Sequence, residues 1–392
     1  MLRVLVHAPY YRPHVGGVEA YVEELADALW ATGGIAALTV LAPALPPGAP
    51  AREVQANDTV VVRYPAIEAV PNFPVPRFAS RGWRDACRAA RELNPDLVVG
   101  HTRFFVPALA ALLHARRLGV PYIHTEHGSD FVQMNGGWTG RVARLYDETL
   151  GRQVLRRADV RIAVSAAAAD FVGRLAGVEA TVVHRGLPTA RLAAVDPAPE
   201  AARLAAGRPL IAYVGRLIDG KGVADLVDAI AALTDDTLCV IVGDGPCRAD
   251  LEERARPHGE RFLFTGYLPE DEALSWVKAA DVVVNPSYTE GLPTTVLWAA
   301  ALGRGIVATD VGGTGEIVAD ETSALLVPAR AVPALRGALE RLVRDPALRA
   351  RLGVAARRDV HARFDEAAGA RSWLAAVAGA PPRAARPTEL VS

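Results

Sequence analysis

Residues 209–233 read PLIAYVGRLIDGKGVADLVDAIAAL, and this stretch decides the fold. It begins with an apolar run, 209–214, that is typical of a buried strand, and it ends with helical spacing over 223–233. Between the two lies a short turn that contains three glycines: Gly215, Gly220 and Gly222. A strand that passes through a glycine-containing turn into a helix is the unit from which parallel α/β sheets are built.

The same turn contains Lys221, one of only two lysines in a chain with 43 basic residues. Because arginine is used almost everywhere else, a lysine five residues after Arg216 suggests two cations that hold adjacent phosphates. Strand-to-helix turns also present backbone N–H groups to anions. The alternative is that Lys221 is a solvated loop charge. The turn is not a P-loop, because the chain has no G-x-x-x-x-G-K-[ST], and no G-x-G-x-x-G follows the first strand.

Length and composition predict a globular protein with two domains. The chain has 392 residues, and this length exceeds what one hydrophobic core usually organises. Its composition, 51% hydrophobic and 22% charged, is typical of a globular protein. The formal net charge of −1 argues against a nucleic-acid partner. The arginine-rich stretch 141–161 is most simply a solvated helix face; the alternative is a weak patch for an acidic substrate or a peripheral membrane contact.

The three cysteines, Cys87, Cys239 and Cys247, are too few for a disulfide framework and lack zinc-ligand spacing, and a reducing cytoplasm suits them. The apolar start of the chain is too short for a signal peptide, and no uninterrupted run of about 20 apolar residues could cross a membrane. We therefore expect a cytoplasmic protein. Nothing in the sequence indicates its oligomeric state.

Short apolar runs alternate with helical patterns in both halves, which predicts an α/β fold of two doubly wound, Rossmann-like domains facing a central cleft. The expected strands are 3–7, 37–41, 60–64, 97–100, 122–125, 160–164 and 181–184 in the first half, and 210–214, 238–242, 262–265, 282–285, 306–309 and 324–327 in the second. Ligands bind beyond the carboxyl ends of such strands, so the cleft is the expected active site.

The domain boundaries follow from composition. We expect domains at 1–190 and 208–378, joined by a linker at 191–207 that is rich in proline and alanine. The last helix is expected to be able to pack back on the first domain. The tail at 379–392 contains three prolines and is expected to be disordered.

An ordered set of motifs surrounds the turn. GGVE lies at 16–19, and the turn is followed by GDGP at 243–246, FTGYL at 264–268, NPSYTEGLP at 285–293 and VGGTGE at 311–316. In this order and spacing the chain resembles the retaining glycosyltransferase family 4 (group 1), which has the GT-B fold. The resemblance covers about residues 2–375. No single motif is specific, but the ordered set is.

The resemblance implies a nucleotide-sugar donor held mainly by the C-terminal domain and an acceptor held mainly by the N-terminal one. We expect the donor to be UDP- or GDP-linked and the acceptor to be a small molecule. It assigns Arg216 and Lys221 to the diphosphate, where preplaced cations stabilise the leaving group more in the transition state than before it. It places Glu290 and His127 on the transferred sugar. For Glu290 the alternative is a carboxylate near a helix start.

Further binding residues follow from the resemblance and from the helix that begins near Thr294. The expected donor contacts are Gly17, Gly215, Tyr267, Leu268, Leu292, Pro293, Thr294 and Thr295. Tyr267 and Leu268 match the seat of the nucleotide base and are otherwise core residues. The expected acceptor contacts are Gly16, Glu126 and Asp130.

Two features concern the donor. No D-x-D occurs, so we expect no metal and no other cofactor. Trp298 stands eight residues after Glu290, where the family motif has a second glutamate that contacts the ribose hydroxyls. Tryptophan cannot accept hydrogen bonds from two hydroxyls. Either another residue holds the ribose, or donor binding is altered, or the chain is a descendant that binds without catalysing.

We therefore expect a metal-independent hexosyltransferase that moves a hexose or amino-hexose to a hydroxyl with retention. The arginine- and alanine-rich composition suggests a GC-rich bacterial genome, where an aminocyclitol antibiotic intermediate is one candidate acceptor. Lipid and polysaccharide acceptors, and a non-catalytic sugar-nucleotide-binding protein, are alternatives. The order of the motifs disfavours a nucleotide-sugar epimerase or a sugar phosphorylase.

Overall fold

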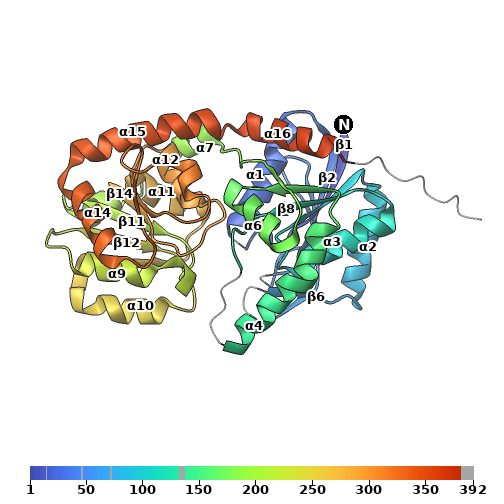
Figure 1. Cartoon of the computed structure of the whole chain (residues 1–392), viewed down its shortest axis with the longest axis horizontal. Helices are drawn as coiled ribbons and strands as arrows, with labels where there is room; N and C mark the ends of the chain where they lie inside the picture. The colour runs from blue at the N-terminus through green and yellow to red at the C-terminus, as the bar shows by residue number, and fades with distance from the viewer. Residues whose placement is uncertain (15, 46, 71–72, 132–136, 381–392) are drawn as a thin grey trace, which may run out of the picture. The chain divides into compact units, whose positions relative to one another are not determined.

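A computed structural model describes residues 1–14, 16–45, 47–70, 73–131 and 137–380. The chain divides into two compact units, one formed by Met1–Leu187 with the segment that starts at Glu366, and one formed by Pro188–Asp365. Each unit contains a largely parallel sheet flanked by helices (Figure 1), which confirms the expected α/β class with two Rossmann-like halves. The expected tail from residue 381 onward lies outside the described residues.

The first unit is built on an eight-stranded sheet in the order β10-β9-β8-β7-β1-β2-β4-β3. Its strands are β1 (Leu2–His7), β2 (Ile35–Pro43), β3 (Arg52–Val54), β4 (Val60–Tyr64), β7 (Leu97–His101), β8 (Tyr122–Glu126), β9 (Val160–Ala163) and β10 (Thr181–Val182). Every strand expected for this half is present. All neighbours pair in parallel except β3, which is antiparallel to β4.

Three short strands of the first unit were not expected from the sequence. They are β3 and the antiparallel pair β5 (Ala66–Val70) and β6 (Phe73–Pro76). Two of the four residues in β6 are prolines, which lack an N–H donor and make a strand look like a loop.

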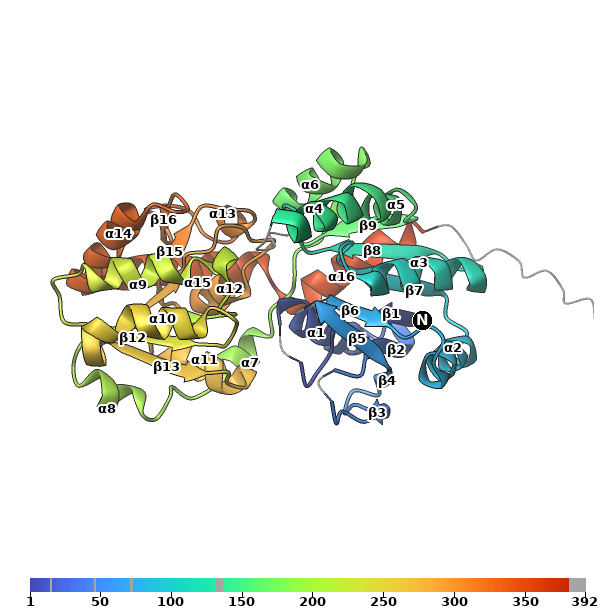
Figure 2. The same ribbon diagram turned by 90° about the horizontal axis from the view of Figure 1, so that it is seen from below.

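The helices of the first unit cover its sheet. They are α1 (Gly17–Ala31), α2 (Arg81–Leu93), α3 (Val106–Leu118), α4 (Gly137–Tyr146), the π-helix η1 (Asp147–Gly151), α5 (Arg152–Arg156), α6 (Ala166–Ala176) and α16 (Glu366–Ala378). The helix α16, red in Figures 1 and 2, packs on α1, so this late segment belongs to the unit in which the chain begins.

The second unit is a six-stranded parallel sheet in the order β13-β12-β11-β14-β15-β16. Its strands are β11 (Leu210–Val214), β12 (Leu238–Val242), β13 (Phe262–Gly266), β14 (Val282–Asn285), β15 (Gly305–Thr309) and β16 (Leu325–Val327). All of them were expected. The order reverses between β11 and β14, and in open parallel sheets such a switch point is where ligands bind.

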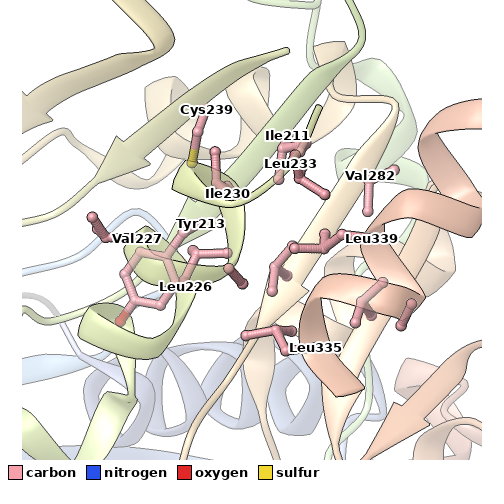
Figure 3. Close-up of a cluster of buried hydrophobic side chains, with 14 of the residues drawn as sticks. Ile211, Tyr213, Leu226, Val227, Ile230, Leu233, Cys239, Val282, Leu335 and Leu339 are labelled. Atoms are coloured by element: carbon pink, nitrogen blue, oxygen red, sulfur yellow. The ribbon is translucent and has the colours of Figure 1, made fainter. Parts of the chain in front are cut away.

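Helices lie on both faces of this second sheet. One face carries α9 (Val223–Ala231), α10 (Arg248–Ala255) and α14 (Val332–Arg344), and the other carries α11 (Glu270–Ala279), α12 (Thr294–Ala301) and α15 (Pro346–Arg363). Figure 3 shows Leu226 and Ile230 of α9 and Leu339 of α14 packed over Ile211 and Val282 of the strands. The strands are buried on both faces, so they are apolar runs rather than alternating ones.

Residues 191–207, expected as a linker, belong to the second unit. They contain the end of α7 (Thr189–Ala194) and all of α8 (Ala201–Ala205). The Ala198 N–H donates to the Ser275 carbonyl, and Lys278 Nζ donates to the Ala193 carbonyl. Helices of five or six residues among prolines give too little periodicity to be recognised in the sequence.

The remaining short helices are η2 (Asp219–Lys221), η3 (Arg256–Arg261) and α13 (Thr314–Ile317). No helix in the described part of the chain is both long and apolar enough to cross a membrane.

Candidate functional site

The turn after β11 is held by backbone contacts that only glycine allows. A Cβ on Gly243 would lie 1.9 Å from the carbonyl oxygen of Gly215. Gly222 has a φ of 62°, and a Cβ there would lie 2.1 Å from the Pro286 carbonyl oxygen. The loops that follow β12, β11 and β14 therefore pack backbone against backbone at the carboxyl ends of their strands.

Lys221 and Glu290 meet at this edge of the sheet. Lys221 Nζ donates to Glu290 Oε1 at 2.6 Å. The same oxygen accepts from Ser287 Oγ at 2.7 Å and from Asn285 Nδ2 at 3.4 Å. The Glu290 side chain is 10% exposed and that of Lys221 26%. One carboxylate oxygen is thus fixed by three donors, while the ammonium group stays within reach of solvent.

Arg216 projects from the same turn and is exposed. Its backbone carbonyl accepts from the buried Tyr213 hydroxyl at 2.9 Å, which fixes the main chain at this position. The Arg216 guanidinium forms no hydrogen bond or ion pair with the residues that the structure describes. A guanidinium without such a partner, next to a glycine-rich turn, is available to an anion.

The other expected donor residues lie on the loops of this edge. Thr295 Oγ1 donates to the Val214 carbonyl at 2.9 Å and ties the start of α12 to β11. Pro293 precedes the first turn of α12, and Leu292 and Thr294 are partly exposed beside it. The Tyr267 side chain is 53% exposed, which excludes it from the core. Leu268 is half-buried.

Trp298 is buried in α12 and is 7% exposed. Its indole Nε1–H has no hydrogen-bond partner among the described residues. Trp298 is therefore a core aromatic residue of α12, and its N–H can only donate.

His127 follows β8 and lies beside the end of β7. His101 Nδ1 lies 3.1 Å from His127 Nε2, and the Tyr21 ring packs edge-on against His127 with the centroids 4.7 Å apart. Burial, with a smaller contribution from the neighbouring His124 and Arg185, lowers the pKa of His127 to about 3. His127 is therefore a neutral imidazole near pH 7, with one nitrogen directed to His101.

Glu126 is one of the expected acceptor contacts. Its side chain is fully buried, and its carboxylate accepts from Arg103 and from the backbone N–H groups of His127 and Gly128. A carboxylate enclosed in this way supports the loop, and its expected contact with an acceptor stays a prediction. Asp130 is exposed, and its Oδ1 accepts from the Phe131 N–H at 2.8 Å.

Gly16 and Gly17 lie at the start of α1. A Cβ on Gly16 would lie 2.6 Å from Glu19 Oε2, and Glu19 Oε1 lies 2.6 Å from His14 Nδ1. The Glu19 side chain therefore leaves no room for a Cβ at Gly16, which explains the glycine without a ligand. Gly17 is exposed as the first residue of the helix.

Sequence reasoning missed three residues around the His127 loop: His101, which lies beside His127, and Arg103 and Asp147, which are joined to the loop through Glu126. His101 ends β7 and Arg103 lies two residues beyond it, and that position was the one available signal. Among the described residues, no three or more His, Cys, Asp or Glu side chains are grouped so that they could hold a metal ion.

Two family models match the chain. The model described as "Glycosyl transferases group 1" matches residues 208–345, and the one described as "Glycosyltransferase Family 4" matches residues 15–191. Between them they cover every strand of the two main sheets except β1.

Named proteins are similar over most of the chain. A 2-deoxystreptamine glucosyltransferase of Streptomyces kanamyceticus is 32% identical over 79% of this chain and 85% of its own length. An uncharacterised glycosyltransferase of Methanocaldococcus jannaschii is 28% identical over 93% of this chain and 95% of its own length. The crystal structure of Anabaena HepE in complex with UDP and glucose has a TM-score of 0.73 at 18% identity, covering 96% of this chain and all of that one.

Proposed function

Because the chain belongs to the family 4, group 1 glycosyltransferases with the GT-B fold, we propose that it transfers a hexose or amino-hexose from a nucleoside diphosphate sugar to a hydroxyl with retention at the anomeric carbon. The observation that carries the proposal is the contact between Lys221 Nζ and Glu290 Oε1. It joins a cation for the diphosphate and a carboxylate for the sugar at the switch point of one sheet.

Arg216 and Lys221 are proposed to hold the diphosphate. A departing nucleoside diphosphate concentrates negative charge on its phosphate oxygens, and cations already in place stabilise that charge. Lys221 is held by Glu290, whereas the Arg216 guanidinium is not committed to a described side chain. A UDP-linked donor is supported by the structural similarity to the UDP complex of HepE.

The transfer itself needs no nucleophile from the protein. As the bond between the anomeric carbon and the phosphate oxygen breaks, the acceptor oxygen forms its bond on the same face. The hydroxyl proton passes to the leaving diphosphate. In this scheme Glu290 and the neutral His127 orient the transferred sugar, and the two cations neutralise the leaving group without a metal ion.

A small acceptor is supported by the relatives. The similarity to a 2-deoxystreptamine glucosyltransferase makes an aminocyclitol the first acceptor to test. We place the reaction in the cytoplasm, where the three free cysteines would stay reduced.

The test is transfer by the purified chain from UDP-glucose, UDP-N-acetylglucosamine and GDP-mannose to 2-deoxystreptamine and to inositol phosphate. Mass spectrometry detects the product, and NMR gives its anomeric configuration. Lys221→Ala is expected to lower kcat by about 100- to 1,000-fold, as for the loss of other preorganised donors.

The matched control is Lys278→Ala, the other lysine of the chain, which bonds the carbonyls of Ala193 and Val195. It should leave transfer unchanged in the folded protein. An inverted product, or equal activity of Lys221→Ala and the wild type, would contradict the proposal.

A further inference from the structure

A network of buried charges lies behind the His127 loop and has no part in the scheme above. Arg103 Nη1 donates to Glu126 Oε1 at 3.0 Å, and Arg103 Nη2 donates to Asp147 Oδ2 at 3.0 Å. None of these three side chains is more than 1% exposed. Because burying ionised groups costs most of what their attraction returns, stability alone does not explain such a network.

The network is attached to the backbone of the loop at three points. Glu126 Oε1 accepts from the N–H of His127 at 3.1 Å and from the N–H of Gly128 at 2.8 Å. Arg103 Nη2 also donates to the Asp130 carbonyl at 3.0 Å. The main chain from 127 to 130 is therefore fixed by one guanidinium and one carboxylate.

Glu126 is held in its ionised form. Burial alone would raise its pKa, but the charge of Arg103 and the hydrogen bonds from His124 and the Gly128 N–H outweigh burial and lower it. An ionised carboxylate accepts more strongly from backbone N–H groups than a neutral acid does.

Asp147 reaches Arg103 through an irregular helix. It is the first residue of the π-helix η1, which lies between α4 and α5. π-helical turns are rare and are frequent at functional sites. Within the same turn, a Cβ on Gly151 would lie 3.2 Å from Asp147 Oδ1, so a larger residue would crowd the carboxylate. The local sequence thus departs from a regular helix at the point where Asp147 meets the guanidinium.

We propose that Arg103 and Asp147 are positioning residues that fix the backbone carrying His127. Asp147 orients the Arg103 guanidinium, Arg103 orients Glu126, and Glu126 holds the two N–H groups of the loop. The inference rests on the proposed function, in which His127 contacts the transferred sugar. Since the diphosphate is held in the other unit, the network is expected to affect kcat rather than the KM for the donor.

Two variants test the network. Arg103→Lys keeps the charge but loses the fork that bonds Glu126, Asp147 and the Asp130 carbonyl together. Asp147→Asn keeps the shape and removes the charge, so it serves if the lysine variant does not fold. In folded protein each variant is expected to lower kcat by about 10- to 100-fold, because displacing a group that positions the substrate by about 1 Å slows the reaction by this factor. The donor KM should stay within a few-fold of the wild-type value.

Asp159→Asn is the matched control. The Asp159 carboxylate accepts from the Tyr122 N–H at 2.8 Å, so it holds the same strand, β8, at its opposite end. This variant should lower the melting temperature without lowering kcat. If the two network variants lose only melting temperature and keep kcat, the positioning role is wrong.

Amide hydrogen exchange separates this inference from the proposed function. Exchange at His127 and Gly128 should become faster in Arg103→Lys and Asp147→Asn, and it should be unchanged in Asp159→Asn. This readout needs no substrate. If the wild type transfers no sugar, the proposed function fails and exchange still tests the network. Unchanged protection of both amides would overturn the inference.

Discussion

Lys221 Nζ lies 2.6 Å from Glu290 Oε1, and this contact joins the loops after β11 and β14, the two strands between which the order of the second sheet reverses. A carboxylate at this point keeps the lysine at the edge of the sheet when no ligand is bound. It also means that an incoming diphosphate competes with Glu290 for the ammonium group. The two residues should therefore affect the binding of UDP, which carries no sugar for Glu290 to contact, in opposite directions.

Glu290→Gln is expected to separate binding from catalysis. The amide removes the negative charge beside Lys221, so the affinity for UDP should stay the same or rise, while kcat falls by about 100-fold or more. Calorimetry with UDP and initial rates measure the two effects. Glu340→Gln, on a partly exposed pair with Arg336 in α14, is the control and should change neither. Weaker UDP binding by Glu290→Gln would contradict the competition.

Removal of divalent metal is expected to leave transfer intact. Arg216 and Lys221 are proposed to supply the positive charge that a metal ion supplies to diphosphates in other enzymes. Rates measured after dialysis against EDTA should equal those measured before it. A large loss that Mg²⁺ or Mn²⁺ restores would show that the two cations do not suffice.

How far the sequence predicts this structure depends on whether a feature is local. The central strands of both main sheets form apolar runs because they are buried on both faces, and all strands of these sheets except the short β3 were predicted. Arg216, Lys221, Glu290 and His127 could be singled out because each lies on a loop after a strand and within a motif.

Arg103 and Asp147 could not be found in this way. An arginine is unremarkable in a chain with 43 basic residues, and burial of its side chain is decided by tertiary packing. Asp147 lies in the stretch 141–161, which was interpreted as a solvated helix face, whereas its side chain is buried at the start of a π-helical turn. The inward position of Glu126 was not predicted either, because a residue at a strand end can point inward as well as toward a ligand.

Gly243→Ala is expected to destabilise the turn at the donor site. Its φ is 143°, and the added Cβ would lie 1.9 Å from the Gly215 carbonyl oxygen, so the backbone of one loop must move. We expect a loss of about 2–3 kcal/mol in the free energy of unfolding, measured in urea, with weaker UDP binding. Gly337→Ala in α14 meets no atom within 4 Å and should gain about 1 kcal/mol instead. Equal stability of the two variants would contradict the steric argument.

Acid is expected to destabilise the first unit through a buried histidine pair. His7 Nε2 lies 3.0 Å from His114 Nδ1. Burial, with the positive charges of Arg117 and Arg91, lowers the pKa of His114 to about 4, and burial also holds the pKa of His7 well below its ordinary value. In the unfolded chain these histidines bind protons at about pH 6.5, so the folded state loses stability as the pH falls from there toward 4. His114 alone should lower the free energy of unfolding by about 3 kcal/mol at pH 4.

The measurement is urea unfolding across this pH range. His114→Asn keeps a polar atom near His7 and should flatten the pH dependence, whereas His258→Asn, on the partly exposed η3, should not. A wild-type free energy of unfolding that is constant down to pH 4 would contradict the prediction.

Cys247 offers a chemical probe of the proposed donor site. Its Sγ donates to Asp219 Oδ1 at 3.2 Å, and Asp219 lies in the same turn as Lys221. Burial and the Asp219 carboxylate raise the pKa of this thiol to about 11, so alkylation near pH 8 should be up to about 100-fold slower than for an ordinary thiol. Asp219→Asn should speed the reaction, and Asp235→Asn, on an exposed pair with Arg344, should not. Bound UDP should slow alkylation of Cys247 further, and mass spectrometry of the labelled peptide measures the rate. Equal rates with and without UDP at saturating concentration would place the nucleotide away from this turn.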